Sequence, residues 1–252
     1  MDEHRMQAML GWWDTSLGQR VLGQELLHID NLVSRFVGPY ALYMGVGSMS
    51  QCLRASRAEV LMECLPPLKP HHRYSAQADF SALPIRPQSL DGVVLHHLLD
   101  VVPNPHDVIR ETCMAIIPGG RLLIVGFNPY SLWGVWRGVR RYREGRAPWL
   151  CQFLSPLRAM DWLKVMGFQV DRVEHAVFDW PSQDVQWRQR FGWMGRIGQR
   201  FLTPFGAVYC MSAVKREYGA ISGRKSSRRP AVVMPMRARA LREGAVRRNE
   251  DV

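Results

Sequence analysis

No stretch of this sequence approaches the roughly 18 consecutive apolar residues that a membrane-spanning helix requires. The first ten residues include Asp2 and Glu3 and lack the apolar core of an export signal. No internal repeat is apparent. We therefore expect a soluble protein of the cytoplasm.

Cysteine is scarce, with five residues in a chain of 252. The five are widely spaced and never form a CxxC pair, so neither a disulfide framework nor a zinc knuckle is indicated. We expect five reduced thiols.

The formal net charge is +11, and most of it lies at one end of the chain. Residues 219–252 contain nine Lys or Arg side chains against three acidic ones, which leaves the rest of the chain mildly basic. This segment is rich in Arg, Ser, Pro and Gly and has no apolar periodicity, so we predict a disordered basic tail. Such a tail could make weak contacts with nucleic acid.

The remaining residues are enough for one α/β domain, because 47% of the chain is hydrophobic. Short apolar runs alternate with helical stretches, a pattern typical of a parallel sheet covered by helices. The predicted strands span residues 40–47, 59–65, 90–98, 121–127, 169–178 and 207–215.

Three helical regions have clear signals. Residues 12–36 carry Leu22, Leu26, Ile29 and Val33 at helical spacing, which predicts one or two amphipathic helices. A second helix begins near Pro105, with Val108, Ile109, Thr112, Cys113 and Ile116 inward, and ends at Pro118-Gly119-Gly120. A third runs from an N-cap at Ser155 to a stop at Gly167.

The turn Gly45-Val46-Gly47 follows the first predicted strand and precedes a helix. Glycines there let backbone amides approach a ligand at a helix N-terminus, although a glycine-rich turn can also be purely structural. Glu63 ends the second predicted strand, where nucleotide-binding sheets place an acid that binds ribose hydroxyls. Its alternative is a solvent-exposed carboxylate at a strand end.

Downstream segments resemble class I S-adenosylmethionine-dependent methyltransferases with a type 11 domain. The resemblance lies in residues 78–84 (ADFSALP) with 89–94 (SLDGVV), and in Asn104-Pro105, Arg110-Glu111 and 117–122 (IPGGRL). Residues 126–131 and 161–163, with the basic tail, further resemble the YafS-like branch of bacterial proteins. The motifs cover about residues 38–127, and strand order extends the likeness to 215.

The resemblance implies a Rossmann-like, seven-stranded, mostly parallel sheet with helices on both faces. It divides the chain into N-terminal capping helices (1–37), a methyltransferase domain (38–218) with an insertion at 128–149, and the tail (219–252).

It also implies the cofactor S-adenosylmethionine. By position, Gly45, Val46 and Gly47 would face its methionine part, Glu63 its ribose, Asp79 and Phe80 its adenine, and Leu95 and His96 its methyl-donating end. The sequence departs from the family pattern at Tyr43, where an acid is usual, and at Met49, where a third glycine is usual.

Other motifs have competing interpretations. Asn128-Pro129-Tyr130 has the composition of an amino-methyltransferase signature but follows the wrong strand, so a structural turn is favoured. The pairs His71-His72 and His96-His97 suggest metal ligands, but adjacent strand residues point to opposite faces and no third ligand is suitably spaced. We predict no metal site. His96 can be a general base or a packed, hydrogen-bonded residue.

The segment 131–146 interleaves Trp and Arg residues. It can be a lid helix over the substrate pocket, or it can contact nucleic acid or an anionic lipid surface.

The leading hypothesis is methyl transfer from S-adenosylmethionine to an unidentified acceptor, with a small molecule favoured. Correct placement of donor and acceptor can carry the reaction, so no catalytic residue is assigned. The alternatives are an inactive binding protein with this fold and an RNA-associated protein that uses the basic tail.

Overall fold

A computed structural model describes residues 3–46, 49–65, 75–144, 146–181 and 203–216. All of them lie in one unit, Met1–Glu217. The basic tail predicted at 219–252 and the glycine at position 47 lie outside the described residues.

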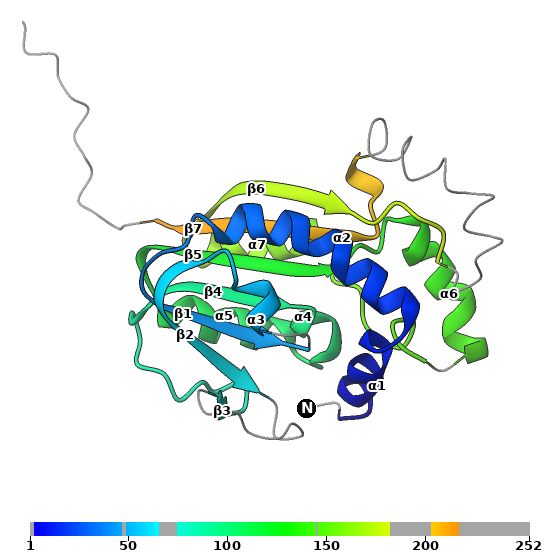
Figure 1. Cartoon of the computed structure of the whole chain (residues 1–252), viewed down its shortest axis with the longest axis horizontal. Coiled ribbons are helices and arrows are strands. Elements are labelled where there is room, and N and C mark those ends of the chain that lie inside the picture. The colour runs from blue at the N-terminus through cyan, green and yellow to red at the C-terminus, as the bar shows by residue number, and fades with distance from the viewer. Residues whose placement is uncertain (1–2, 47–48, 66–74, 145, 182–202, 217–252) are drawn as a thin grey trace, which may run out of the picture. The chain divides into compact units, whose positions relative to one another are not determined.

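A seven-stranded sheet forms the centre of this unit, in the order β3-β2-β1-β4-β5-β7-β6 (Figure 1). Strands β1 to β5 pair in parallel, and β7 runs antiparallel to both of its neighbours. The predicted mostly parallel, seven-stranded sheet is therefore confirmed. The strands are β1 (Val37–Gly45), β2 (Arg57–Leu65), β3 (Ser75–Gln77), β4 (Leu90–His96), β5 (Ile116–Phe127), β6 (Phe168–Ala176) and β7 (Val208–Lys215).

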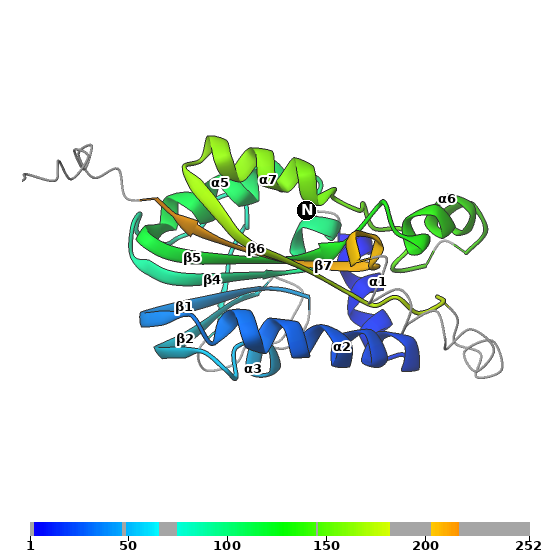
Figure 2. The same ribbon diagram turned by 90° about the horizontal axis from the view of Figure 1, so that it is seen from above.

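Helices cover both faces of the sheet, as predicted. Seen along its edge, α2 (Ser16–Val33) and α3 (Met49–Cys52) lie on one face, and α5 (Pro105–Ala115) and α7 (Pro156–Val165) on the other (Figure 2). Strands β4 and β7 and the second halves of β1 and β5 are mostly apolar and buried, as expected for a sheet covered on both sides, whereas β2 and β6 are largely exposed or half-buried. The remaining helical elements are α4 (Leu98–Val101), α6 (Leu132–Glu144) and the 3₁₀ turn η1 (Thr203–Phe205).

Two helices precede the sheet, α1 (Glu3–Trp13) and α2. Thr15 caps α2, since its hydroxyl oxygen accepts a hydrogen bond from the Gly18 N–H at 3.1 Å. The side chains of Trp12 and Trp13 at the end of α1 pack against Phe127 and His96, the last residues of β5 and β4. The N-terminal helices thus close over the carboxyl ends of these strands. In the described part of the chain, no helix has both the length and the apolar character needed to cross a membrane.

The helix predicted between Pro105 and Pro118 is shorter than expected. Val108, Ile109, Thr112 and Cys113 are buried, as predicted. However, α5 ends at Ala115, and Ile116 begins β5 by pairing with Leu90, so Pro118-Gly119-Gly120 lies inside the strand. A register shift between Leu90 and Gly92, with φ of +81° at Gly119, accommodates the irregularity.

Candidate functional site

The predicted cofactor residues follow the carboxyl ends of neighbouring strands. Tyr43 of β1 pairs with Glu63 of β2, and Gly45 pairs with His96 of β4. A Cβ atom at Gly45 would lie 2.5 Å from the His96 carbonyl oxygen, so only glycine allows this close approach. The next residue continues the contact, because the Val46 N–H donates to the same oxygen at 3.2 Å. The structure therefore brings Gly45, Val46, Glu63 and His96 to one edge of the sheet.

The other predicted residues occupy different surroundings. Leu95 is fully buried in β4, and Phe80 is buried after β3. Asp79 is exposed, and its carboxylate accepts a hydrogen bond from the Ser81 N–H at 2.9 Å. Glu63 is 8% exposed, which is not the solvent-exposed strand end considered from the sequence. The cofactor roles given to these residues stay predictions.

Tyr43 stands at the position where the resemblance to methyltransferases implies an acid. Its side chain is fully buried, and its hydroxyl lies 3.1 Å from Nδ1 of His96. The hydroxyl is also 2.9 Å from the place where a Gly45 Cβ would be. Tyr43 therefore links the glycine turn to the end of β4.

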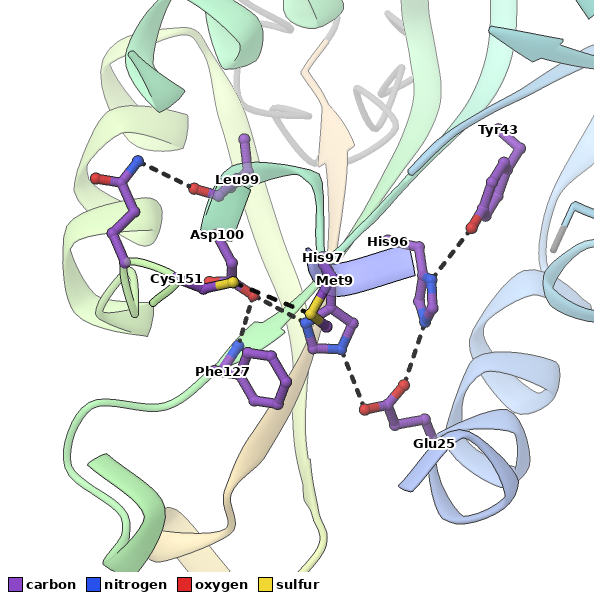
Figure 3. A network of polar contacts seen from close by, with 10 residues as sticks. Met9, Glu25, Tyr43, His96, His97, Leu99, Asp100, Phe127 and Cys151 are labelled. Carbon is purple, nitrogen blue, oxygen red and sulfur yellow. Dashed lines mark hydrogen bonds and ion pairs between the residues drawn. The ribbon is translucent and has the colours of Figure 1, made fainter. Parts of the chain in front are cut away.

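A buried cluster occupies the end of β4, and Glu25 on α2 is its centre. One carboxylate oxygen of Glu25 lies 3.2 Å from Nε2 of His96. The other lies 3.1 Å from Nε2 of His97. All three side chains are completely buried. Figure 3 shows both imidazole rings directed at the same carboxylate.

For His96 and His97, the expectation that adjacent histidines point to opposite faces is wrong. Alternation of side chains requires both residues to be in an extended strand. His96 is the last residue of β4, whereas His97 has φ of +50° in the left-handed region at the start of α4. This turn of the backbone swings the His97 ring to the side of His96. The third side chain comes from a helix far away in the sequence, so no local spacing could reveal it.

His97 lies between two carboxylates. Its Nδ1 is 2.8 Å from Asp100, which also accepts a hydrogen bond from the Phe127 N–H at 3.0 Å. Burial alone would lower the pKa of His97, but Glu25 and Asp100 raise it to about 9. Burial works against the charge on Glu25 too, yet the two histidines hold its pKa below the usual value. For Asp100 burial prevails and raises the pKa.

Aromatic side chains enclose the cluster. The Trp13 ring stacks on His96 with centroids 5.3 Å apart, and the Phe127 ring is 4.3 Å from the His97 ring. Phe127 also stacks with Phe153 and with Trp133 of α6. These contacts exclude water from the polar groups, which strengthens their mutual electrostatic interactions.

The motif Asn128-Pro129-Tyr130 is a structural turn, as favoured from the sequence. The Asn128 side-chain oxygen accepts from the Tyr130 N–H at 3.0 Å. Its amide group donates to the carbonyl oxygens of Pro204 and Gly206. The first bond shapes the loop after β5, and the two amide bonds hold this loop against the segment before β7, so the side chain is committed to structure.

Helix α6 occupies most of the predicted insertion. Trp133 is buried and donates from its indole N–H to the Asp179 carbonyl oxygen at 2.8 Å. Arg137 donates to the Cys151 carbonyl oxygen at 2.7 Å, and its guanidinium lies 5.1 Å from the Phe153 ring centroid. Trp133 and Arg137 thus both hold α6 against the rest of the protein, and its role as a lid stays a prediction.

A surface groove of about 490 Å³ lies at the start of α7, between Tyr130, Phe153 and Trp162. Of the predicted cofactor residues that the structure describes, none lines it. It is therefore distinct from the edge of the sheet that carries Gly45 and Glu63.

Comparison with known sequences supports the motif-based resemblance. Residues 45–124 match the family described as a methyltransferase domain. The uncharacterized protein YafS of Escherichia coli (strain K12) is 35% identical over 94 residues, which is 37% of this chain and 39% of YafS. The chain thus matches well under half of that relative's length. The likeness to methyltransferases and to YafS is confirmed, and the domain implies S-adenosylmethionine as its cofactor, as predicted.

Solved structures with this fold include several methyltransferases. A methyltransferase from Thermotoga maritima has a TM-score of 0.56 at 15% identity, covering 82% of this chain and 100% of its own. A Haloferax volcanii methyltransferase, in complex with the Trm112 activator, has a TM-score of 0.56 at 15% identity, covering 80% and 92%. The cyclase SpnF has a TM-score of 0.51 at 14% identity, covering 76% and 80%. These likenesses show the fold.

Glu25, Tyr43 and Asp100 were not predicted as members of a polar cluster. A signal for Glu25 exists in the sequence, because it lies three residues after Leu22 and four before Ile29, on the inward face of an amphipathic helix. A carboxylate at such a position needs a buried partner. Which partner it finds depends on how α2 packs on the sheet.

Proposed function

We propose that this protein transfers a methyl group from S-adenosylmethionine to a small-molecule acceptor. The observation that carries the proposal is the approach of Gly45 to the end of β4, with the buried Glu63 on the adjacent strand β2. An edge of this kind offers a glycine turn that a ligand can approach closely and a carboxylate for ribose hydroxyls, side by side.

In this proposal each group of residues contacts a different part of the cofactor. Gly45, Val46 and Gly47 contact its methionine part, and Glu63 accepts hydrogen bonds from the ribose hydroxyls. Asp79 and Phe80 contact the adenine. Leu95 and His96 lie at the methyl-donating end, where β4 meets the buried cluster.

Catalysis would come mainly from the correct placement of the methyl donor and the acceptor. A methyl group moves in line from sulfur to a nucleophile, and holding the two together in a site without water lowers the barrier by several kcal/mol (roughly 7–11 in favourable cases). The aromatic side chains of Trp13, Phe127 and Trp133 favour a small acceptor, since they enclose the polar groups beyond β4.

Calorimetric titration with S-adenosylmethionine and its demethylated product tests the cofactor assignment. We expect binding by the wild type and at least tenfold weaker binding by Glu63→Gln. Glu59→Gln is the matched control, because Glu59 is exposed on the same strand, further from the carboxyl end. No binding by the wild type at millimolar cofactor would overturn the proposal.

The second candidate is a binding protein that keeps the fold without catalysis. It is favoured by Tyr43, whose buried hydroxyl is engaged with His96 at the position where the resemblance implies an acid. The cyclase SpnF also shows that this fold can carry other chemistry. Transfer of a labelled methyl group, assayed across small-molecule, RNA and protein fractions, distinguishes the candidates: cofactor binding without transfer to any fraction favours the second.

An RNA-associated role for the basic tail is a separate proposal from the sequence. It requires RNA binding that weakens steeply with salt and that is lost on truncation at Gly219. Unchanged RNA binding after truncation would exclude it.

A further inference from the structure

We propose that Glu25, His96 and His97 form a binding site for one divalent transition-metal ion of the zinc class. The site does not depend on methyl transfer: it rests on three side chains, from α2, the end of β4 and the start of α4, that meet inside the protein (Figure 3). The ion would join α2 to the end of β4, beside the predicted cofactor edge.

The spacing of the donor atoms suits such an ion. Zinc binds imidazole nitrogen and carboxylate oxygen at about 2.0–2.2 Å, so tetrahedral ligand atoms lie about 3.4 Å from each other. The two Glu25 oxygens are 3.2 Å and 3.1 Å from Nε2 of His96 and His97, and the three donor groups lie within 4.8 Å of one another. Movements of less than 1 Å, on the order of ordinary side-chain displacements, would admit the ion.

Each histidine also has the outer partner that metal-binding histidines need. A ligating imidazole uses one nitrogen for the metal and holds its orientation through the other. Nδ1 of His97 is 2.8 Å from the Asp100 carboxylate, and Nδ1 of His96 is 3.1 Å from the Tyr43 hydroxyl. Both Nε2 atoms are therefore the ones that face Glu25, and both rings are fixed in that orientation.

Charge also favours a divalent ion. The imidazoles of His96 and His97 lie beside two buried carboxylates, those of Glu25 and Asp100. Buried charged groups are paired or coordinate a metal. A divalent ion bound by the two Nε2 atoms and Glu25 would place two positive charges beside the two carboxylates. Any proton on a ligating Nε2 leaves to solvent when the ion binds.

Two imidazoles and one carboxylate are typical ligands of zinc and its neighbours, whereas magnesium and calcium prefer oxygen alone. Three protein ligands leave one coordination position for water or another small ligand, the arrangement of catalytic and not of closed structural zinc sites. The surrounding aromatic side chains from α1 and β5 would protect that position from bulk water.

The test uses the full-length chain with any purification tag removed. We expect the purified protein to contain close to one equivalent of zinc or a neighbouring metal by mass spectrometry of the elements. After removal by a chelator, titration with Co²⁺ should restore one equivalent and give visible absorption bands of a low-coordinate nitrogen and oxygen site. Zinc should raise the Tm of the metal-free protein by several degrees.

Variants identify the ligands. Glu25→Gln and His97→Asn should lower Co²⁺ uptake at least tenfold. His28→Asn is the matched control, because His28 lies on the same helix and pairs with a different carboxylate, Glu174, at 2.7 Å. A second control removes the other histidine pair, His71 and His72. Both controls should retain the metal.

Two results would overturn the proposal. One is a wild-type protein that arrives without metal and takes up no Co²⁺ at micromolar concentration, which would assign the cluster to hydrogen bonding alone. The other is loss of the metal in the His71 and His72 double variant. Should Glu25→Gln and His97→Asn fail to fold, X-ray absorption of the metal-loaded wild type decides: scattering from fewer than two imidazoles contradicts the site.

Discussion

Gly45 is needed for packing whether or not a cofactor binds. The atoms that a Cβ would meet include the His96 carbonyl oxygen at 2.5 Å, which belongs to a paired strand and cannot move aside. Gly45→Ala should therefore lower the free energy of unfolding by about 1–3 kcal/mol, the usual cost of overpacking. Urea denaturation followed by tryptophan fluorescence measures the change.

The control for this substitution is Gly23→Ala. Gly23 lies in α2, and no atom lies within 4 Å of its added Cβ. Alanine is the better helix former, so this variant should gain about 0.5–1 kcal/mol. If both alanine variants changed stability alike, close approach would not be the reason for glycine at position 45.

The five cysteines should be unreactive in the folded protein. All are buried, and burial raises the pKa of Cys64 to about 11 and of Cys113 to about 12. Since the thiolate is the reactive form, a disulfide reagent at pH 8 should titrate almost no thiol before unfolding and five after it. A thiol that reacts within minutes in the native protein would show that one of these sites opens readily.

Helix α2 positions Glu25 in the buried cluster. Thr15 stabilises the start of this helix twice: its hydroxyl accepts from the Gly18 N–H and donates to the Trp12 carbonyl oxygen at 2.7 Å. Thr15→Ala should cost about 1 kcal/mol of unfolding free energy, the typical value of an N-cap.

Thr15→Ser supplies the comparison, since serine keeps the hydroxyl and should retain most of the stability. Chemical denaturation of both variants measures the difference. Equal losses in the two variants would mean that the methyl group, and not the cap, stabilises this turn.

Most strands and helices could be predicted because their patterns are local. The apolar runs for β1, β4 and β7 and the Ser155 cap of α7 are of this kind. Two features were less accessible. The three-residue strand β3 is too short to show a pattern. Strand β5 begins at Ile116, before Pro118-Gly119-Gly120. These residues belong to the strand only because Ile116 pairs with Leu90 of β4.

The buried cluster could not be predicted, because it depends on tertiary structure at each step. Glu25 is separated from His96 and His97 by 71 and 72 residues. It reaches them only because α2 packs across the sheet, and His97 reaches Glu25 only because its backbone is left-handed. The predicted cofactor edge was more accessible, since the order of parallel strands brings Gly45, Glu63 and His96 together once the sheet is known.

The stability of the folded chain should decrease in weak acid, and His175 on β6 is one identifiable source. Burial lowers its pKa below the usual value of 6.5, and in the described part of the chain its Nδ1 has no hydrogen-bond partner. The unfolded chain therefore takes up the proton first as the pH falls. The contribution of His175 to the free energy of unfolding is complete above about pH 6.5. It is lost as the pH drops through the lower pKa of His175 in the folded state.

His175→Leu should remove this proton uptake, so its stability should depend less on pH between 7.5 and 5 than that of the wild type. Urea denaturation at both pH values gives the two free-energy differences. His106→Leu, at an exposed position of α5, is the control and should keep the wild-type pH dependence. If His175→Leu and the wild type lost stability equally on acidification, the acid sensitivity would have to come from other titrating groups.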